Sequence, residues 1–427
     1  MKTKLIGKSG APTHSFVTFR CDEDRDQAID KLEGYEWKNK KLIVRKANPI
    51  PDPLVEKRNE SEKSDETKDK KRVKTEEKQM SDEELSNALN DKISCFWKMC
   101  YNQQMKEKFY SINSFIVKLN KEISKTNNED YPHNKCCLLE DLRVSPVVNG
   151  YRNKCEFTVG IDKTVGFRLG LYRDGTVKVI SPALNCPIIG DKMRNALNGC
   201  QKYISTESKL IGFDPEFNSG HWIQCVVRTT RNDSMIIFCL HPQQQTPEEL
   251  KEEKQKIKKF FENNTEFGVN SVYIHISSKR HQMSNEHLDH LFGQQYIFET
   301  LEMERELKFR ISPLAFFQIN TIGAKICFET IADLIKPTKE IILLDICCGT
   351  GTIGLSLASK VRKVIGIELN GDAICDAEFN AKSNGITNVE YIEGKAEDMI
   401  GKALELCGFD TEIVAVIDPP RAGLSKH

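Results

Sequence analysis

The run "IILLDICCGTGTIGLSLA" at residues 341–358 constrains the fold of this chain more than any other stretch. It opens with an apolar segment of strand length, and apolar residues at helical spacing follow the two glycines Gly349 and Gly351. A buried strand, a glycine turn and a helix in this order are typical of a βα unit in a parallel sheet. Glycine is needed at such a turn because the backbone has to approach a ligand closely. We therefore expect an α/β fold for residues 311–427.

Two kinds of ligand fit this turn. The letters GTGTIG satisfy GxGxxG, the pattern of dinucleotide-binding turns, so a nicotinamide-dependent oxidoreductase is one alternative. Three carboxylates favour S-adenosylmethionine (SAM) instead. Asp345 stands four residues before Gly349, and Glu368 ends the next apolar run, "KVIGIELN", where a carboxylate can accept both ribose hydroxyls. Asp418, in "VAVIDPPR", ends a later run and has no use in a dehydrogenase. We predict that Asp345, Gly349, Gly351 and Glu368 bind SAM.

The pattern of polar and apolar residues changes several times in the part of the chain before residue 311. Residues 140–310 alternate polar and apolar side chains between Gly/Asp turns, which predicts a β-rich domain. Residues 81–139 carry apolar side chains at helical spacing after a capping box formed by Ser81 and Glu84, and we expect ordinary packing helices there. Residues 51–80 have almost no apolar side chains and therefore predict a disordered, charged linker.

Residues 1–50 predict a small αβ module. A strand is expected at "FVTF", residues 16–19, followed by a helix that includes Ala28 and Leu32 and by a second strand at residues 41–44. This order resembles the second half of an RNA-recognition motif, and "FVTF" resembles the end of its RNP1 signature. The start of that signature departs from the pattern, so the aromatic residues that stack on bases are partly absent. No strand is placed before "FVTF". RNA binding and a structural docking role both remain open.

Composition limits the other classes of function. Lys and Arg number 62 and Asp and Glu number 62 among 427 residues, so a nucleic-acid surface has to be a local patch. No apolar run reaches about 18 residues, and we expect no membrane span. The 15 cysteines show no CxxC pair or framework spacing. We expect neither a metal site nor an iron–sulfur cluster, and a reducing location, the cytoplasm or the nucleus. The run "KDKKRVK" is either a nuclear import signal or an exposed mixed-charge segment.

Five motifs together resemble the RNA uracil-C5 methyltransferase family. In chain order they are "SPVVNGYRNKCEFTVG", "SPLAFFQIN", "LLDICCGTGTIGLSLA", "GIELN" and "DPPRAGL". The resemblance implies a class I SAM-dependent methyltransferase domain with a Rossmann-like fold at residues 311–427 and a central RNA-binding domain at residues 140–310. It also implies a tRNA partner and methyl transfer from SAM to C5 of the T-loop uridine, which gives 5-methyluridine.

The resemblance also implies roles for single residues. Gln318, Glu368 and Asp418 match positions that bind the cofactor, and Phe316 matches an aromatic residue that lies against the target base. A stacked ring suits a uridine that has left its loop to reach the enzyme. The strand that faces the RNA is matched by Tyr151, Arg152, Asn153 and Lys154. Arginine and lysine contact phosphates in such strands, and tyrosine stacks on bases.

The chemistry requires two further groups. A thiolate that adds at C6 makes C5 of the uracil nucleophilic, and a base then removes the C5 proton. The resemblance implies that a cysteine and a glutamate beyond the DPPR motif fill these roles. The chain ends at His427, before either position, so we expect an incomplete methyltransferase domain without catalytic residues. Cys347 and Cys348 are expected to be packing residues and not substitutes. The alternative is a non-catalytic RNA-binding or tRNA-folding factor that keeps the fold.

Overall fold

The structure is a computed structural model that describes most of the chain after residue 80. The described residues are 2–6, 14–18, 22–37, 40–41, 43–46, 81–127, 137–170, 178–182, 186–278, 283–408, 411–421 and 423–424. The chain divides into two compact units, residues 1–70 and residues 71–427, each treated by itself below. None of the described helices is both long enough and apolar enough to cross a membrane. The charged segment at residues 51–80 lies outside the described residues.

The first unit contains a hairpin, a helix and a second, very short hairpin. Its elements are β1 (Lys2–Ile6), β2 (His14–Thr18), α1 (Asp22–Leu32), β3 (Glu36–Trp37) and β4 (Lys40–Lys41). The expected helix is confirmed, and the strand expected at residues 16–19 is β2, which begins two residues earlier. Two predictions are wrong in detail. A strand, β1, does precede β2 and pairs with it antiparallel, and the strand expected at residues 41–44 is only the short β4.

Two helices open the second unit. α3 (Asp82–Ile93) begins with the predicted capping box, in which Ser81 and Glu84 each accept the backbone N–H of the other. α4 (Tyr101–Asn127) follows. The expectation of ordinary packing is wrong for part of α4, because the side chain of Phe115 is 63% exposed while its neighbour Ile116 is buried. The apolar residues of α4 spread around more of the helix than the face that the protein covers.

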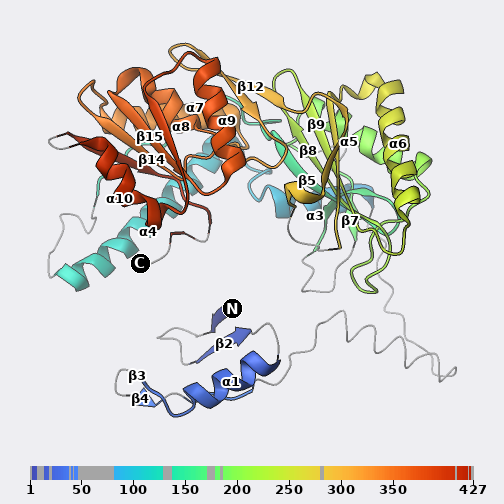
Figure 1. Cartoon of the computed structure of the whole chain (residues 1–427), viewed down its shortest axis with the longest axis horizontal. Helices are drawn as coiled ribbons and strands as arrows, with labels where there is room; N and C mark the ends of the chain where they lie inside the picture. Colours follow the sequence, from blue (N-terminus) through green and yellow to red (C-terminus); the bar gives the residue numbers. More distant parts are fainter. Residues whose placement is uncertain are drawn as a thin grey trace. The chain divides into compact units, whose positions relative to one another are not determined.

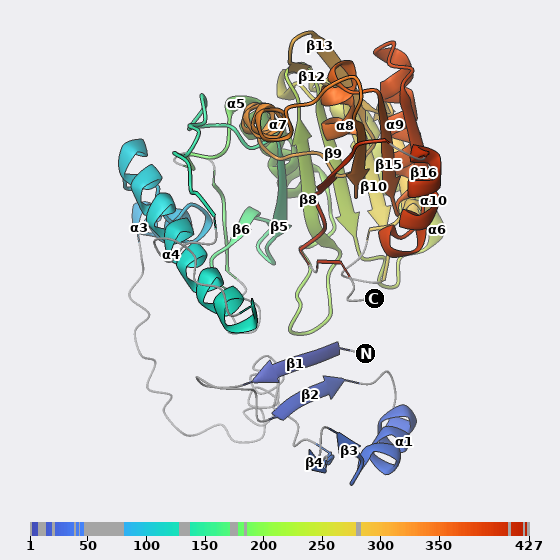
Figure 2. The same ribbon diagram turned by 90° about the vertical axis from the view of Figure 1, so that its left-hand side faces the viewer.

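The central domain is a seven-stranded sheet in the order β11-β10-β9-β8-β5-β6-β7. Its strands are β5 (Lys154–Val159), β6 (Val165–Arg168), β7 (Val179–Ile180), β8 (Trp222–Thr229), β9 (Ser234–Leu240), β10 (Ser271–Ile276) and β11 (Leu288–Gly293). Helices α5 (Asp191–Lys202) and α6 (Pro247–Asn263) cover one face (Figure 1). Figure 2 shows the central strands side by side. The predicted β-rich domain is confirmed.

The side chains of β9 alternate between two hydrophobic cores, and this alternation explains how the sheet packs against the rest of the unit. Successive side chains of a strand point to opposite faces. Ile236 and Phe238 therefore belong to a core shared with α5 and α6, whereas Met235 and Ile237 belong to a second core shared with residues between 297 and 391. All residues of β9 are buried, because both faces of the strand are covered. The central sheet and the region that follows it are thus parts of one packed body.

The last region is a parallel α/β domain, as expected. An antiparallel ribbon, β12 (Ile297–Glu302) and β13 (Glu306–Ile311), leads through α7 (Thr321–Ile335) into a four-stranded sheet in the order β16-β15-β14-β17. The strands are β14 (Ile342–Ile346), β15 (Lys363–Glu368), β16 (Val389–Glu393) and β17 (Ile413–Ile417), and the helices are α8 (Thr352–Leu357), α9 (Gly371–Ser383) and α10 (Ala396–Cys407). The order reverses between β14 and β17, and ligands of such sheets bind at the carboxyl ends of the strands flanking that point.

Candidate cofactor and RNA site

The glycine loop after β14 is shaped for close approach of a ligand. Gly349 and Gly351 both have left-handed backbone angles, with φ of 56° and 78°. A Cβ atom on Gly351 would lie 2.7 Å from the hydroxyl of Tyr391, so this position has no space for a side chain. At Gly349 no atom lies within 4 Å of the Cβ position. The partly exposed backbone of Gly349 therefore leaves space for a ligand, which is what the predicted role requires.

Asp345 is buried at the end of β14. Its Oδ2 atom accepts the N–H of Gly354 at 2.8 Å, and Oδ1 has no hydrogen-bond partner among the described residues. Burial, together with the nearby carboxylates of Asp418 and Glu368 and against the hydrogen bond from Gly354, raises the pKa of the Asp345 carboxyl to about 7. A buried carboxylate with an unused oxygen is stabilised by a cationic group, and SAM carries such groups.

Glu368 ends β15 and holds the glycine loop directly. Its Oε2 atom accepts the N–H of Gly349 at 3.0 Å, and its Oε1 atom accepts the N–H of Asn370 at 2.9 Å. The sequence predicted a carboxylate placed for ribose hydroxyls and missed this second role. Each carboxylate oxygen has a further lone pair, so the loop contacts leave acceptor capacity for a ligand.

Asp418 and Gln318 meet across 100 residues of sequence. Asp418 follows β17, and its N–H donates to the carbonyl oxygen of Ile346 at 3.2 Å. The side-chain amide of Gln318 donates to Oδ2 of Asp418 at 3.1 Å. The structure thus brings together at the carboxyl ends of β14, β15 and β17 the residues that the sequence assigned to cofactor binding. They are Gln318, Asp345, Gly349, Gly351, Glu368 and Asp418.

The surroundings of the two loop cysteines disfavour the thiolate form. Burial raises the pKa of the Cys347 thiol, and the carboxylates of Glu368 and Asp345 raise it further. Cys348 is buried, and burial together with the same two carboxylates raises the pKa of its thiol well above the usual value. A nucleophilic cysteine needs a lowered pKa, because the thiolate is the reactive form. This environment agrees with the prediction that Cys347 and Cys348 are packing residues.

The segment predicted to face RNA and the "SPLAFFQIN" segment are joined by Asn153. Its N–H donates to the carbonyl oxygen of Ile319 at 2.9 Å. Its side-chain amide donates to the carbonyl oxygen of Gln318 at 2.8 Å and to the hydroxyl of Thr321 at 3.0 Å. The sequence matched Asn153 to the RNA-facing strand and did not anticipate that its side chain fixes the cofactor segment.

The other predicted RNA residues differ in exposure. Phe316 is 60% exposed, whereas the next residue, Phe317, is buried against the second core, so Phe316 is free to lie against a base. Arg152 and Lys154 are partly exposed beside the same segment, with Nε of Arg152 donating to the carbonyl oxygen of Lys154 at 2.9 Å. Tyr151 is half-buried and packs against the first core. Its ring is less available for stacking than the sequence suggested.

Sequence reasoning missed Arg228, which holds the segment that carries Phe316. Arg228 is 3% exposed and forms no ion pair with any carboxylate in the described part of the chain. Its guanidinium donates to the carbonyl oxygens of Ser312 at 2.7 Å and Pro313 at 3.0 Å and to that of Ala315. Burial lowers its pKa to about 10, so the group stays charged near neutral pH. A single arginine in the apolar strand "CVVRTT" was the only sequence signal for this role.

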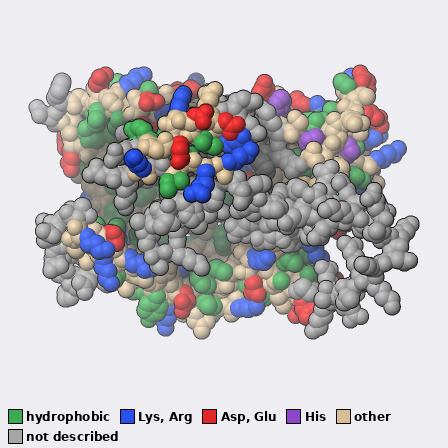
Figure 3. Space-filling model, turned by 90° about the horizontal axis from the view of Figure 1, so that it is seen from below, with side chains coloured by type: hydrophobic (Ala, Val, Ile, Leu, Met, Phe, Trp, Pro, Cys, Tyr) green, Lys and Arg blue, Asp and Glu red, His purple; other side chains and the backbone are tan. Residues whose placement is uncertain are grey.

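Positive and negative side chains are mixed on the protein surface, in line with a net charge of zero. On the face drawn in Figure 3, Lys and Arg side chains lie interspersed with Asp and Glu among the described residues. The described residues also contain no group of three or more His, Cys, Asp or Glu side chains that could hold a metal ion. Any contact with nucleic acid therefore depends on local groupings of cations.

Known proteins resemble this chain along nearly its whole length. The family model described as tRNA (Uracil-5-)-methyltransferase matches residues 214–427. The tRNA (uracil-5-)-methyltransferase homolog A of Homo sapiens is 38% identical over 99% of this chain and 66% of its own length. The homolog A of Mus musculus is 38% identical over 99% of this chain and 68% of its own length. Homolog B of Homo sapiens is 39% identical over 79% of this chain and 69% of its own length.

A solved structure shows the same fold. The Pyrococcus abyssi tRNA (uracil-54, C5)-methyltransferase in complex with S-adenosyl-L-homocysteine superposes with a TM-score of 0.51 at 24% identity, covering 66% of this chain and 63% of that one. The chain spans about two thirds of the length of these relatives. A family match over half of the residues, with relatives that align from one end of the chain to the other, establishes that this chain belongs to the tRNA (uracil-5-)-methyltransferase family.

Proposed function

We propose that this chain binds SAM and tRNA and forms the cofactor-binding and RNA-positioning part of an enzyme that methylates C5 of the T-loop uridine. The observation that carries the proposal is the hydrogen bond from Gln318 to Asp418, because Gln318 follows the exposed Phe316 by only two residues. This spacing supports a cofactor pocket next to the predicted position of the target base. Family membership supports the same reaction and leaves the nicotinamide alternative without support.

The residues around the glycine loop fit SAM. Oδ1 of Asp345 has no partner in the described part of the chain, and the backbone of Gly349 is open. Bound SAM would supply a methyl group on a sulfonium. In our proposal the carboxylate of Asp345 is stabilised by positive charge on the ligand, and Glu368 accepts hydrogen bonds from the ribose while keeping the N–H of Gly349 in place.

The remaining residues would position the RNA. Phe316 stacks on the uracil, and Arg152 and Lys154 pair with phosphates of the strand that carries it. Arg228 and Asn153 fix the segment on which Phe316 stands. Methylation at C5 also needs a thiolate that adds at C6 and leaves again, and a base that takes the C5 proton.

We propose no residue of this chain for the thiolate or for the base. The raised pKa values of Cys347 and Cys348 support this choice for the two thiols nearest the cofactor loop. The same observation favours a second candidate function, a tRNA-binding or tRNA-folding factor that retains the methyltransferase fold without turnover.

The first test is transfer of labelled methyl from SAM to unmodified tRNA by the 427-residue chain, followed by nucleoside analysis. Calorimetric SAM binding and tRNA binding are measured in parallel. Label in 5-methyluridine would establish the enzyme and show that a cysteine of this chain serves as nucleophile. Binding of both ligands without transfer would support the second function. If fusion of the C-terminal segment of homolog A then restored transfer, the first function would hold for the longer protein. A chain that binds neither ligand would contradict both.

A further inference from the structure

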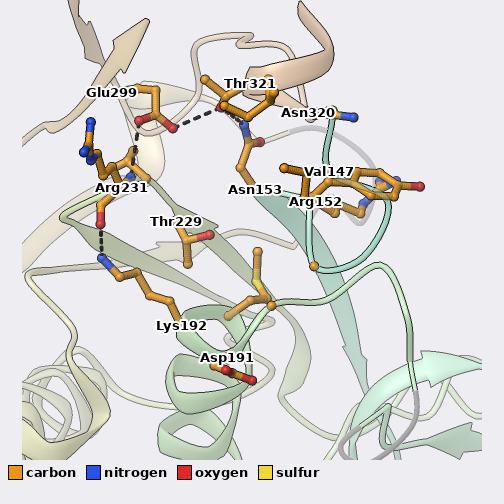
Figure 4. A pocket seen from close by; sticks show the side chains of 16 residues that line it. Val147, Arg152, Asn153, Asp191, Lys192, Thr229, Arg231, Glu299, Asn320 and Thr321 are labelled. Atoms are coloured by element: carbon orange, nitrogen blue, oxygen red, sulfur yellow. Dashed lines mark hydrogen bonds between the residues drawn. The ribbon is translucent and has the colours of Figure 1, made fainter. Parts of the chain in front are cut away.

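A pocket of about 350 Å³ is lined by residues of the central domain and of the start of α7, and the glycine loop is not among them. Figure 4 shows side chains from several segments around it. They include Arg152 and Asn153 before β5, Lys192 on α5, Thr229 and Arg231 at the end of β8, and Thr321 on α7. None of the predicted cofactor residues lines this pocket, and neither does Phe316. The pocket is therefore distinct from the SAM and target-base positions.

The pocket is positively charged. Arg152, Lys192 and Arg231 contribute three cations, against two carboxylates, Asp191 and Glu299. The guanidinium of Arg231 is also paired with Glu302, at 2.8 Å, so Arg152 and Lys192 are the cations that carry the positive charge of the pocket. The side chain of Asp191 is fully exposed, so water screens it. Glu299 is buried, and both of its oxygens are already used by protein donors.

Glu299 belongs to the wall of the pocket. Its Oε1 atom accepts the N–H of Arg231 at 3.2 Å and of Thr300 at 3.0 Å, and its Oε2 atom accepts the hydroxyl of Thr321 at 3.0 Å. Because these bonds satisfy the carboxylate, it fixes the turn after β8 to the start of α7. With Glu299 satisfied and Arg231 paired with Glu302, the charges left for a ligand are those of Arg152 and Lys192.

Lys192 is the cation with the clearest set of unused hydrogen-bond donors. Its ammonium donates to the carbonyl oxygen of Arg231 at 2.7 Å, a bond drawn in Figure 4. An ammonium has three donors, so two remain for a ligand. Burial lowers the pKa of Lys192, although Asp233 and Glu299 oppose the shift, and an anion in the pocket would favour its charged form. The first turn of α5, residues 190–193, also lines the pocket and has no side-chain cap, which adds amide donors to those of the lysine.

We infer that this pocket binds a phosphate and the attached nucleotide of the RNA strand next to the uridine that lies on Phe316. The inference rests on the proposed function. Thr321 follows Phe316 by five residues, so the two lie at most ~17 Å apart along the chain, within reach of a flanking nucleotide. Arg152 belongs to the RNA-facing strand and also lines the pocket, which makes the pocket continuous with that strand. Lys192 is thereby a new RNA-binding residue.

The test measures tRNA affinity between about 50 and 200 mM salt, the range over which phosphate contacts change binding strongly. It needs no catalysis. The variants are Lys192→Met, which keeps the aliphatic stem, and Lys192→Glu, which reverses the charge. The matched control is Lys251→Met, on the exposed face of α6 and away from the pocket. Thermal unfolding of each variant checks that the fold is kept, and SAM affinity checks the separate cofactor site.

We expect Lys192→Met to weaken tRNA binding and to reduce the salt slope by about 0.7–0.9, the value of one phosphate contact. Lys192→Glu should weaken binding by at least about tenfold. SAM affinity should not change in either variant, and Lys251→Met should bind tRNA like the unaltered chain. Photo-crosslinking of tRNA that contains 4-thiouridine should label a peptide that includes residues 190–193 or 229–231.

Two results would overturn the inference while leaving the proposed function intact. One is unchanged affinity and salt slope in both Lys192 variants of a chain that binds tRNA. The other is an equal loss in Lys251→Met, which would show that any surface charge matters to the same extent. An unaltered chain that does not bind tRNA would instead contradict the proposed function itself, and the inference with it.

Discussion

Asn153 donates its side-chain amide to the carbonyl oxygen of Gln318 at 2.8 Å, across 165 residues of sequence. Gln318 in turn donates to Asp418 at the end of β17. The strand predicted to face RNA is therefore linked by two hydrogen bonds to the residues predicted to bind the cofactor. If the strand predicted to face RNA moves, we expect Gln318 and the predicted cofactor residues to move with it.

Replacing Asn153 should affect both the stability of the chain and its affinity for SAM. Asn153→Ala removes two side-chain hydrogen bonds and should lower the free energy of unfolding by about 1–2 kcal/mol. Asn153→Asp should cost more, because an acceptor-only carboxylate would then face the carbonyl oxygen of Gln318. Urea unfolding and calorimetric SAM affinity measure the two effects. Asn232→Ala, at an exposed turn, is the control and should change neither. Asn153→Asp with unaltered stability and SAM affinity would contradict the link.

Arg228 should be important for the segment that carries Phe316. Arg228→Met removes three charge-assisted hydrogen bonds and should lower the free energy of unfolding by about 2–4 kcal/mol. Arg228→Lys keeps the charge without the planar fork and should restore only part of that loss. Hydrogen exchange of residues 312–317 should accelerate in both variants. Arg362→Met, on the exposed surface, should stay within about 0.5 kcal/mol of the unaltered chain. Slow exchange of this segment in Arg228→Met would refute the assignment.

The buried carboxyl of Asp345 predicts a specific pH dependence. Its pKa of about 7 in the folded chain lies above the usual 3.8, so between these values the folded state binds more protons than the unfolded state. Stability of the ligand-free chain should therefore fall as the pH rises from about 4 to 7. SAM affinity should rise over the upper part of this range, by up to about tenfold per pH unit below 7, because the ligand pairs with the ionised form.

Asp345→Asn is the control for this pH dependence. The variant should lose the part of the pH slope that comes from residue 345 and should bind SAM weakly at every pH. Thermal unfolding at intervals between pH 5 and 8 measures the first effect, and titration calorimetry measures the second. Parallel pH curves for the variant and the unaltered chain would show that another group titrates instead.

Two variants of Glu368 should distinguish its support of the glycine loop from its contact with the ligand. Glu368→Gln retains an acceptor for the N–H of Gly349 and should reduce SAM affinity by about tenfold through loss of charge. Glu368→Ala removes both contacts and should reduce SAM affinity beyond detection. Glu405→Gln, on the exposed side of α10, should bind SAM normally. Retained SAM affinity in Glu368→Ala would mean that the pocket is elsewhere.

Sequence patterns predicted the cofactor loop well and the supporting contacts poorly. An apolar run, two glycines and a carboxylate at the end of the next strand are local signals, so Asp345, Gly349 and Glu368 could be placed without a structure. The acceptors of Arg228 and the pocket around Lys192 depend on residues far apart in the sequence, which no local pattern records. The exposure of Phe115 on α4 was missed for a related reason, because periodicity shows which residues are apolar and not how much of the helix is covered. The cytoplasmic or nuclear location stays a prediction.

The buried guanidinium of Arg228 has a consequence for synthesis of the chain. Its strand is complete well before its acceptors exist, because the carbonyl of Ser312 lies 84 residues further on. At roughly 5–20 residues per second, a ribosome adds that stretch in roughly 4–17 s. During this interval the nascent central sheet holds a charge that it cannot satisfy internally. We expect the central sheet to stay open on that side until the "SPLAFFQIN" segment emerges, so that the two regions mature together as one cotranslational unit.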